Sequence, residues 1–356
     1  MRYIKLENCV QGMVLAKNVY GSNGALLLRR GVVITQKQLD ALLEVGYAGI
    51  YIHDEASDGL VVPETVDTQT RNAANAAVEG LFSATKMTQV IKQLHLVKAI
   101  EELLQTISDQ IKSHQGTVHN IVSLKTYDSY TYQHCVDVSI ICIVIGKTLN
   151  MNDSTLVELG KAAMLHDIGK MFLPKEILSK PSKLTPSEFM EVKKHSQLGY
   201  DCVKYALTQP ETVCRGVLLH HEQSQGGGYP KGVSSDKIPL FAKIIAVADV
   251  YDAITSKRPY KNAMVASEAY EYIMSNSGRH FDTNIVDVFI RNIAPYPVGS
   301  TVILSDERKA LVINNNAAFM MRPLIKILKN GKQTEEEYID MALDANARNV
   351  TIVGTM

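Results

Sequence analysis

Histidine and aspartate residues interrupt a long run of apolar, helix-forming segments in the middle of the chain, and this pattern limits the folds open to it. The pattern is overwhelmingly helical from about residue 70 to residue 292. An aspartate inside an apolar helix is almost never buried without a partner or a metal ion. The pattern therefore predicts helices packed together around a shared polar centre.

These side chains follow a definite order along the chain: a His, a His-Asp pair, a second single His, a His-His pair and an Asp. Imidazole and carboxylate ligands, without sulfur, suit iron, manganese, nickel or zinc. Any one of these residues alone is more often structural. Together they offer seven ligands, too many for one tetrahedral ion and suited to two ions sharing a bridging carboxylate. The candidate metal ligands are His134, His166, Asp167, His195, His220, His221 and Asp249.

The two ends of the chain have other patterns. Residues 1–66 mix short β-like runs with one helical run that Gly46 should end, which predicts a small α+β module. Residues 67–293 form the predicted helical domain, with its core at 121–293. Residues 294–356 contain short β-branched runs separated by turns, which predicts a small β-rich module. We expect a barrel or sandwich there, with one helical insertion near Glu335.

Two helix starts within the central region are marked clearly. Thr185 to Glu188 reads as a capping box with proline at the first helical position. Pro239 should open the helix that contains Asp249, and Pro259 should close it.

Composition narrows the classes of function. Lys+Arg and Asp+Glu both number 37, and this absence of a basic excess argues against a DNA or RNA binder. No apolar run reaches the roughly 18 residues of a membrane span. The first residues lack the features of a signal peptide, and the five cysteines are scattered as expected for reduced thiols. We therefore expect a cytoplasmic protein with neither a membrane nor a nucleic acid as partner.

Segments within residues 121–292 resemble the HD-GYP branch of the HD phosphohydrolase superfamily of bacteria. The resemblance implies a mainly α fold, an HD-type helical bundle, between the small α+β module and the small β module. It covers roughly half of the chain, and its specificity comes from the joint occurrence of the segments in order. They are DSYTYQH (128–134), HDIGKMFLPKEILSK (166–180), KHSQLGYDCV (194–203), HHEQSQGGGYP (220–230), ADVYDAITSKRPYK (248–261) and GRHFD (278–282).

The resemblance implies a phosphodiesterase that hydrolyses cyclic di-GMP to pGpG and/or GMP. The candidate ligands above would hold the metal ions, and Asp167 would bridge them. Lys170 would contact the scissile phosphate, while Tyr229, Arg258 and Lys261 would hold the dinucleotide. Because Tyr130 replaces a glutamate that helps some relatives bind a third ion, we expect two ions.

The expected chemistry follows from two adjacent cations. A hydroxide shared between the ions would be the nucleophile, and the ions would neutralise charge on the phosphate. Iron or manganese is the first expectation for the metal, and nickel or zinc also suits the ligands. Lys170 lies four residues after His166, so we expect both on one helix face.

The chain departs from the family pattern at the loop after the double histidine. Gln223 and Gln225 replace an arginine and an aspartate, which affects the expectations for substrate affinity and for partner contacts. The partner proteins would be diguanylate cyclases that contact the Gly-Tyr-Pro loop. Two alternatives stay open: a non-catalytic receptor for the dinucleotide, or a phosphohydrolase acting on cyclic GMP-AMP or another nucleotide. The sequence does not indicate the oligomeric state.

Overall fold

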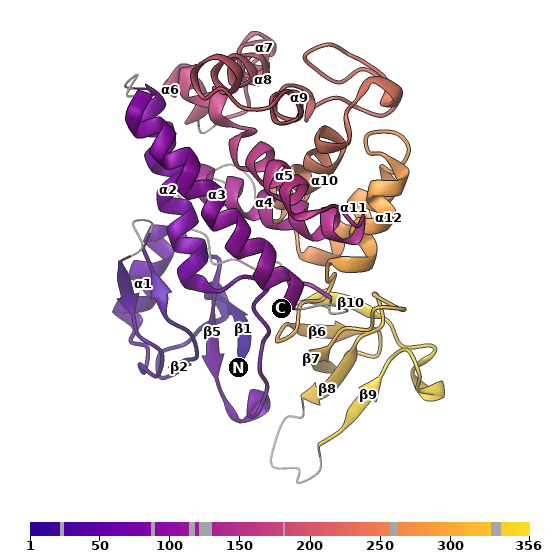
Figure 1. The fold of residues 1–356 in the computed structure, drawn as a ribbon. Coiled ribbons are helices and arrows are strands. Elements are labelled where there is room, and N and C mark those ends of the chain that lie inside the picture. Colours follow the sequence, from indigo (N-terminus) through magenta and orange to yellow (C-terminus); the bar gives the residue numbers. More distant parts are fainter. Residues whose placement is uncertain are drawn as a thin grey trace.

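A helical centre lies between two small antiparallel sheets, which confirms the predicted mainly α fold (Figure 1). The computed structural model describes residues 1–21, 25–86, 90–113, 118–120, 130–180, 182–256, 263–328 and 336–356. Within these ranges no helix is both long and apolar enough to cross a bilayer.

The N-terminal module combines one helix with two small sheets. Helix α1 (Gln36–Val45) starts with a capping box between Thr35 and Gln38 and ends at Gly46. Gly46 has a φ of 91°, a left-handed conformation that glycine adopts readily, so the predicted stop is confirmed. The strands form one sheet in the order β1-β5-β2 and a separate β3-β4 hairpin: β1 (Arg2–Lys5), β2 (Val14–Leu15), β3 (Val19–Tyr20), β4 (Leu26–Leu28) and β5 (Gly49–His53).

The central helices share one hydrophobic core. Helix α4 is buried on every side from Cys135 to Ile145, as expected for a central helix whose surface is apolar all round. It packs against α2, α5, α10 and α12. The helices are α2 (Thr68–Lys86), α3 (Val90–Ser113), α4 (Tyr130–Thr148), α5 (Asp153–Leu165), α6 (Lys175–Leu178), α7 (Pro186–Lys193), α8 (His195–Asp201), α9 (Glu211–Leu219), α10 (Leu240–Thr255), α11 (Ala266–Ser275) and α12 (Thr283–Asn292).

Both predicted helix starts are confirmed. The capping box of Thr185 and Glu188 opens α7, and Pro239 immediately precedes α10. The predicted helix LFAKIIAVADVYDAIT (240–255) is confirmed as α10, which ends at Thr255, where Ser256 takes an extended conformation. Pro259 itself lies outside the described residues.

The C-terminal strands form one antiparallel sheet in the order β10-β6-β7-β8-β9. The expected barrel or sandwich is wrong, because β9 and β10 are the two edges of this sheet and do not pair with each other. Glu335 lies outside the described residues, and the chain just after it forms β9. The strands are β6 (Thr301–Leu304), β7 (Lys309–Asn314), β8 (Leu324–Leu328), β9 (Tyr338–Asp340) and β10 (Ile352–Thr355).

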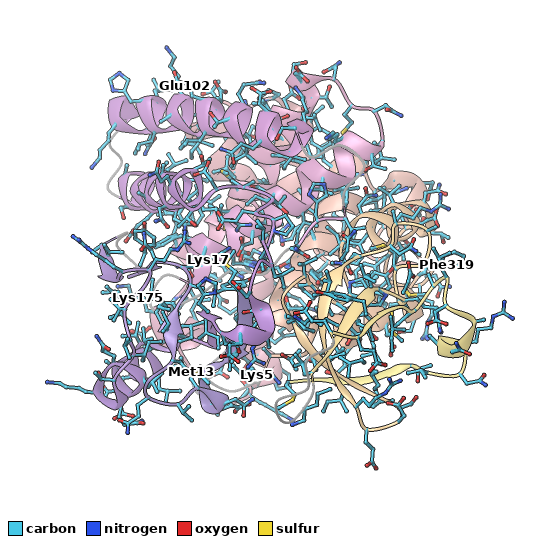
Figure 2. All side chains as sticks on the ribbon, turned by 90° about the horizontal axis from the view of Figure 1, so that it is seen from below. Lys5, Met13, Lys17, Glu102, Lys175 and Phe319 are labelled. Atoms are coloured by element: carbon cyan, nitrogen blue, oxygen red, sulfur yellow. The ribbon has the colours of Figure 1, made fainter. Side chains whose placement is uncertain are left out.

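The two terminal modules lie side by side beneath the helices (Figure 1). Figure 2 shows from below that Lys5 and Met13 belong to one module and Phe319 to the other. The Tyr3 amide donates a hydrogen bond to the Gly299 carbonyl at 2.9 Å, which joins the modules directly. Helices α7, α8 and α9 lie at the opposite end of the molecule. The predicted domain bounds stay a prediction.

Candidate metal centre

The seven candidate metal ligands come from five separate places in the chain and meet inside the helical bundle. Most of them lie at helix ends: His166 and Asp167 follow α5, His195 begins α8, and His220 and His221 follow α9. His134 lies in the second turn of α4 and Asp249 lies within α10. All are buried except His221, which is half-buried.

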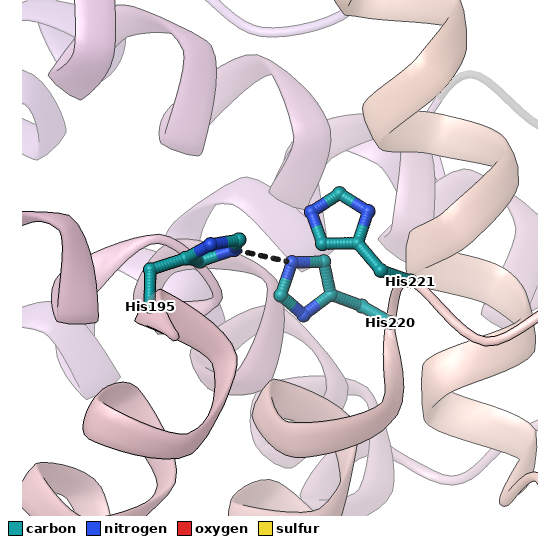
Figure 3. Close-up of side chains that lie close together, drawn as sticks. All are labelled: His195, His220 and His221. Carbon is teal, nitrogen blue, oxygen red and sulfur yellow. Dashed lines mark hydrogen bonds between the residues drawn. The ribbon is translucent and has the colours of Figure 1, made fainter. Parts of the chain in front are cut away.

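The ligand atoms form three overlapping groups, each with its atoms within 4.8 Å of one another. Figure 3 shows His195 and His220 facing one another, with His221 beside them. The Nε2 atoms of His195 and His220 lie 3.4 Å apart. Because one group shares His220 with the first of the others and His166 with the second, the three groups form one extended centre. The groups are His195, His220 and His221; His134, His166 and Asp167; and His166, His220 and Asp249.

Each aspartate faces two sides of this centre. One oxygen of Asp167, Oδ2, lies 3.5 Å from His166 Nε2, and the other, Oδ1, lies 3.6 Å from His195 Nε2. The Oδ1 atom of Asp249 lies 3.0 Å from His134 Nε2, while its Oδ2 atom lies 3.9 Å from His221 Nδ1. A carboxylate whose two oxygens face different imidazoles is suited to contact two ions.

Backbone carbonyls orient three of the imidazoles. The Nδ1 atoms of His166, His195 and His220 each donate to the carbonyl three residues earlier, all at 2.7 Å. Since a carbonyl can only accept, the proton of each neutral ring stays on Nδ1. The Nε2 lone pair then points toward the centre, which is the orientation that a metal-binding histidine needs.

A carboxylate that the sequence reasoning missed orients the fourth imidazole. His134 Nδ1 donates to Asp252 Oδ2 at 2.6 Å, and both side chains are buried. Asp252 lies three residues after Asp249 on the same face of α10. Two aspartates at this spacing in an apolar helix were the signal available in the sequence.

Two buried atoms of the centre lack a hydrogen-bond partner in the structure, namely His166 Nε2 and Asp167 Oδ1. Leaving such polar atoms unsatisfied in a protein interior is costly. A cation satisfies both, because each offers a lone pair directed at the centre. The residues present therefore fit a bound metal.

Protonation at neutral pH also suits metal binding. Burial lowers the pKa of His195 and His220, and it lowers the pKa of His221 to about 3. Burial alone would raise the pKa of Asp167, but the adjacent Lys170 ammonium and neighbouring imidazoles hold it well below its usual range. The pKa of Asp249 is likewise held low against burial by the imidazoles around it, that of His134 first. Neutral imidazoles and ionised carboxylates are the forms that bind metals.

Close backbone packing brings His195 to Asp167. A Cβ atom on Gly169 would lie 1.9 Å from the His195 carbonyl oxygen and 2.6 Å from the Gly199 amide nitrogen. Only a residue without a side chain allows α8 to approach the turn after Asp167 this closely.

Lys170 reaches the centre, but not along a helix face as predicted. Helix α5 ends at Leu165, and Lys170 lies on the following 3-10 helix η3 (Ile168–Phe172). Its Nζ lies 2.5 Å from Asp167 Oδ2, and about a third of its side chain is exposed. The tight turn, not the spacing of an α-helix, places this ammonium beside the centre.

The Gly-Tyr-Pro loop places Tyr229 against the imidazoles. Its ring centroid lies 4.5 Å from that of His221 and 6.2 Å from that of His195. The buried Glu222 carboxylate accepts hydrogen bonds from the backbone amides of Lys231, Gly232 and Val233. The loop shape is thus held by Glu222 and by backbone bonds, such as that from Gln225 to the Arg279 carbonyl at 3.1 Å.

Arg258 and Lys261 lie outside the described residues, and so does the side chain of Tyr130. The first two stay predicted substrate contacts, and the number of ions stays a prediction.

Comparison with known proteins agrees with this site. Residues 89–285, more than half of the chain, match the HD domain family. The cyclic di-GMP phosphodiesterase PA4108 of Pseudomonas aeruginosa is 38% identical over 258 residues, covering 71% of this chain and 60% of that protein. A cyclic di-GMP phosphodiesterase of Thermotoga maritima is 36% identical over 229 residues, covering 64% of this chain and 62% of that protein. The chain thus spans about three fifths of the length of these relatives.

The solved structure of Bd1817, an HD-GYP-type protein of Bdellovibrio bacteriovorus, has a similar fold. It superposes with a TM-score of 0.50 at 17% identity and covers 81% of this chain and 97% of its own. The chain belongs to the HD domain family. The two relatives described above are cyclic di-GMP phosphodiesterases, and the predicted resemblance to the HD-GYP branch is confirmed.

Proposed function

We propose that the chain is a metal-dependent phosphodiesterase that hydrolyses cyclic di-GMP to pGpG and/or GMP. The observation that carries this proposal is the buried centre, in which imidazole Nε2 atoms and two carboxylates face one another. Two relatives that are 38% and 36% identical are cyclic di-GMP phosphodiesterases, which supports the choice of substrate.

The centre would hold two divalent ions, iron or manganese in the first place, with nickel or zinc as alternatives. Asp167 is suited to bridge them, because its two oxygens face His166 and His195. When bound, such ions supply a nucleophile at neutral pH and neutralise charge on a phosphate. The remaining chemistry falls to residues of the chain around the centre.

Lys170 and Tyr229 are the described residues placed to act on the substrate. The Lys170 ammonium is partly exposed beside Asp167, so it can contact the scissile phosphate and stabilise the charge that develops there. Burial raises the pKa of Tyr229, so its phenol stays protonated and can donate a hydrogen bond to the dinucleotide. Arg258 and Lys261 would add phosphate or guanine contacts.

The direct test is turnover by protein loaded with Mn²⁺ or Fe²⁺ under anaerobic conditions. Cyclic di-GMP should disappear, and pGpG or GMP should be detected by ion-exchange chromatography. Asp167→Asn should abolish turnover, while Asp287→Asn, on the exposed face of α12, should behave as wild type. Metal-loaded wild-type protein that forms no product would refute the proposal.

The alternatives predict different results in the same assay. A non-catalytic receptor would bind cyclic di-GMP without turnover. A phosphohydrolase of other specificity would instead convert cyclic GMP-AMP or a nucleotide in a substrate panel. Contacts between the Gly-Tyr-Pro loop and a diguanylate cyclase stay a prediction.

A further inference from the structure

A lysine outside the metal centre lies over the aromatic wall of the site. The Nζ atom of Lys193, the last residue of α7, lies 5.3 Å from the ring centroid of Tyr229 and 4.8 Å from that of Phe189. The side chain is half-buried. No carboxylate of the described chain lies within 4.0 Å of its ammonium.

The next residue provides a contrast. The ammonium of Lys194 lies 2.5 Å from Glu191 Oε2, and 61% of its side chain is exposed. Lys194 is thus a solvated surface lysine with an acidic neighbour. Lys193 instead keeps a positive charge against two aromatic rings, an interaction that is weak at such partly exposed positions. Its charge is therefore available for an anion.

The position of this charge relative to the centre indicates which anion. The Tyr229 ring contacts the Lys193 ammonium as well as the imidazoles of His195 and His221. Lys170 already supplies an ammonium beside Asp167, where the scissile phosphate would lie, whereas Lys193 contacts this wall of the site through the Tyr229 ring. A cyclic dinucleotide carries a second phosphate on the far side of its ring. A lysine on a flexible stem one aromatic ring away suits that second group.

We propose that Lys193 binds the second, non-scissile phosphate of a cyclic dinucleotide. The inference rests on the proposed function, because it takes the site of hydrolysis to be the metal centre. Under this inference Lys193 is a specificity-determining residue, because its contact distinguishes a substrate with two phosphates from a diester with one.

The test compares Lys193→Gln with Lys194→Gln on two substrates, cyclic di-GMP and bis(4-nitrophenyl) phosphate, which has a single phosphate. Lys193→Gln should raise KM for cyclic di-GMP about tenfold, the loss expected for one charge-assisted contact, with kcat within about twofold. Its kcat/KM for the single-phosphate diester should match wild type. Lys193→Arg should recover most of the loss, and Lys194→Gln should match wild type on both substrates.

Two results would overturn the inference. One is an unchanged KM for cyclic di-GMP in Lys193→Gln. The other is an equal loss on both substrates, which would show that the lysine only supports Tyr229. If wild-type protein does not turn over cyclic di-GMP, the proposed function fails separately, and calorimetry decides the inference. Weaker cyclic di-GMP binding by Lys193→Gln than by Lys194→Gln then supports it, while equal binding, or none by wild type, overturns it.

Discussion

Asp252 should control metal affinity although it is not among the candidate ligands. Its Oδ2 accepts the Nδ1 proton of His134 at 2.6 Å, with both side chains 4% exposed or less. Replacing it by asparagine keeps the shape but removes the charge and allows the amide to donate to Nδ1 instead. That change would move the ring proton to Nε2, the atom that faces Asp249. We therefore expect Asp252→Asn to weaken metal binding.

The structure also limits the size and location of this effect. His166, His195 and His220 are oriented by backbone carbonyls, which a side-chain substitution does not remove. Loss of one such outer carboxylate typically weakens metal binding by about 10–100-fold, or roughly 1.4–2.7 kcal/mol. Because His134 is grouped with His166 and Asp167, the loss should fall on one ion.

The assay is competition for Mn²⁺ between the apoprotein and a chelating indicator, which resolves two dissociation constants. Asp252→Asn should raise one constant at least tenfold and leave the other within about twofold. Asp287→Asn, which loses only an exposed pair with Arg291, is the matched control. Unchanged constants, or an equal rise in both, would refute the role assigned to Asp252.

Three further predictions concern the scaffold. Gly169→Ala should lower the free energy of unfolding in urea by at least about 1–3 kcal/mol and displace His195. The control is Gly80→Ala, whose Cβ would meet only Leu96 at 3.4 Å and which should be neutral or slightly stabilising. Equal effects of the two substitutions would contradict the packing argument. Arg71→Met should lower the free energy of unfolding by about 3 kcal/mol, because it removes the guanidinium that pairs with the buried Asp137 carboxylate. Adding Asp137→Asn should restore much of this stability. A double variant no more stable than Arg71→Met would count against the explanation. Burial raises the pKa of the Cys9 and Cys202 thiols to about 11. The rate of their alkylation by iodoacetamide, measured by mass spectrometry, should therefore rise about tenfold per pH unit between roughly pH 8 and 10. A rate that levels off below about pH 9 would contradict the raised pKa.

The composition of the site could be predicted from the sequence because its residues break local rules. The candidate ligands lie within helical segments or at their ends, and the structure brings all seven together. Gly46 and the capping box at Thr185 could be recognised for a similar reason, since their effects are local.

The orientation of the ligands could not be predicted. The carbonyls of Ala163, Val192 and Val217 act through the backbone, so no residue type marks them. The pairing of Asp252 with His134 joins positions 118 residues apart. Helical spacing from His166 predicts Lys170 near the centre, but helix α5 ends at Leu165. Lys170 reaches the centre from the 3-10 helix η3 instead.

The fold of the C-terminal module shows the same limit. Alternating β-branched runs identify strands, but they do not state whether the edge strands meet. A barrel and an open sheet have the same local pattern, and the difference lies in the pairing of β9 and β10. That pairing depends on strands separated by long stretches of chain.

The central claim is that the seven side chains hold a pair of ions. Isothermal titration of anaerobic apoprotein with Mn²⁺, followed by electron paramagnetic resonance of the loaded sample, tests it most directly. We expect about two ions per chain, magnetically coupled through a shared ligand, with the coupling lost in Asp167→Asn. Binding of one ion only, or two ions without coupling, would contradict it.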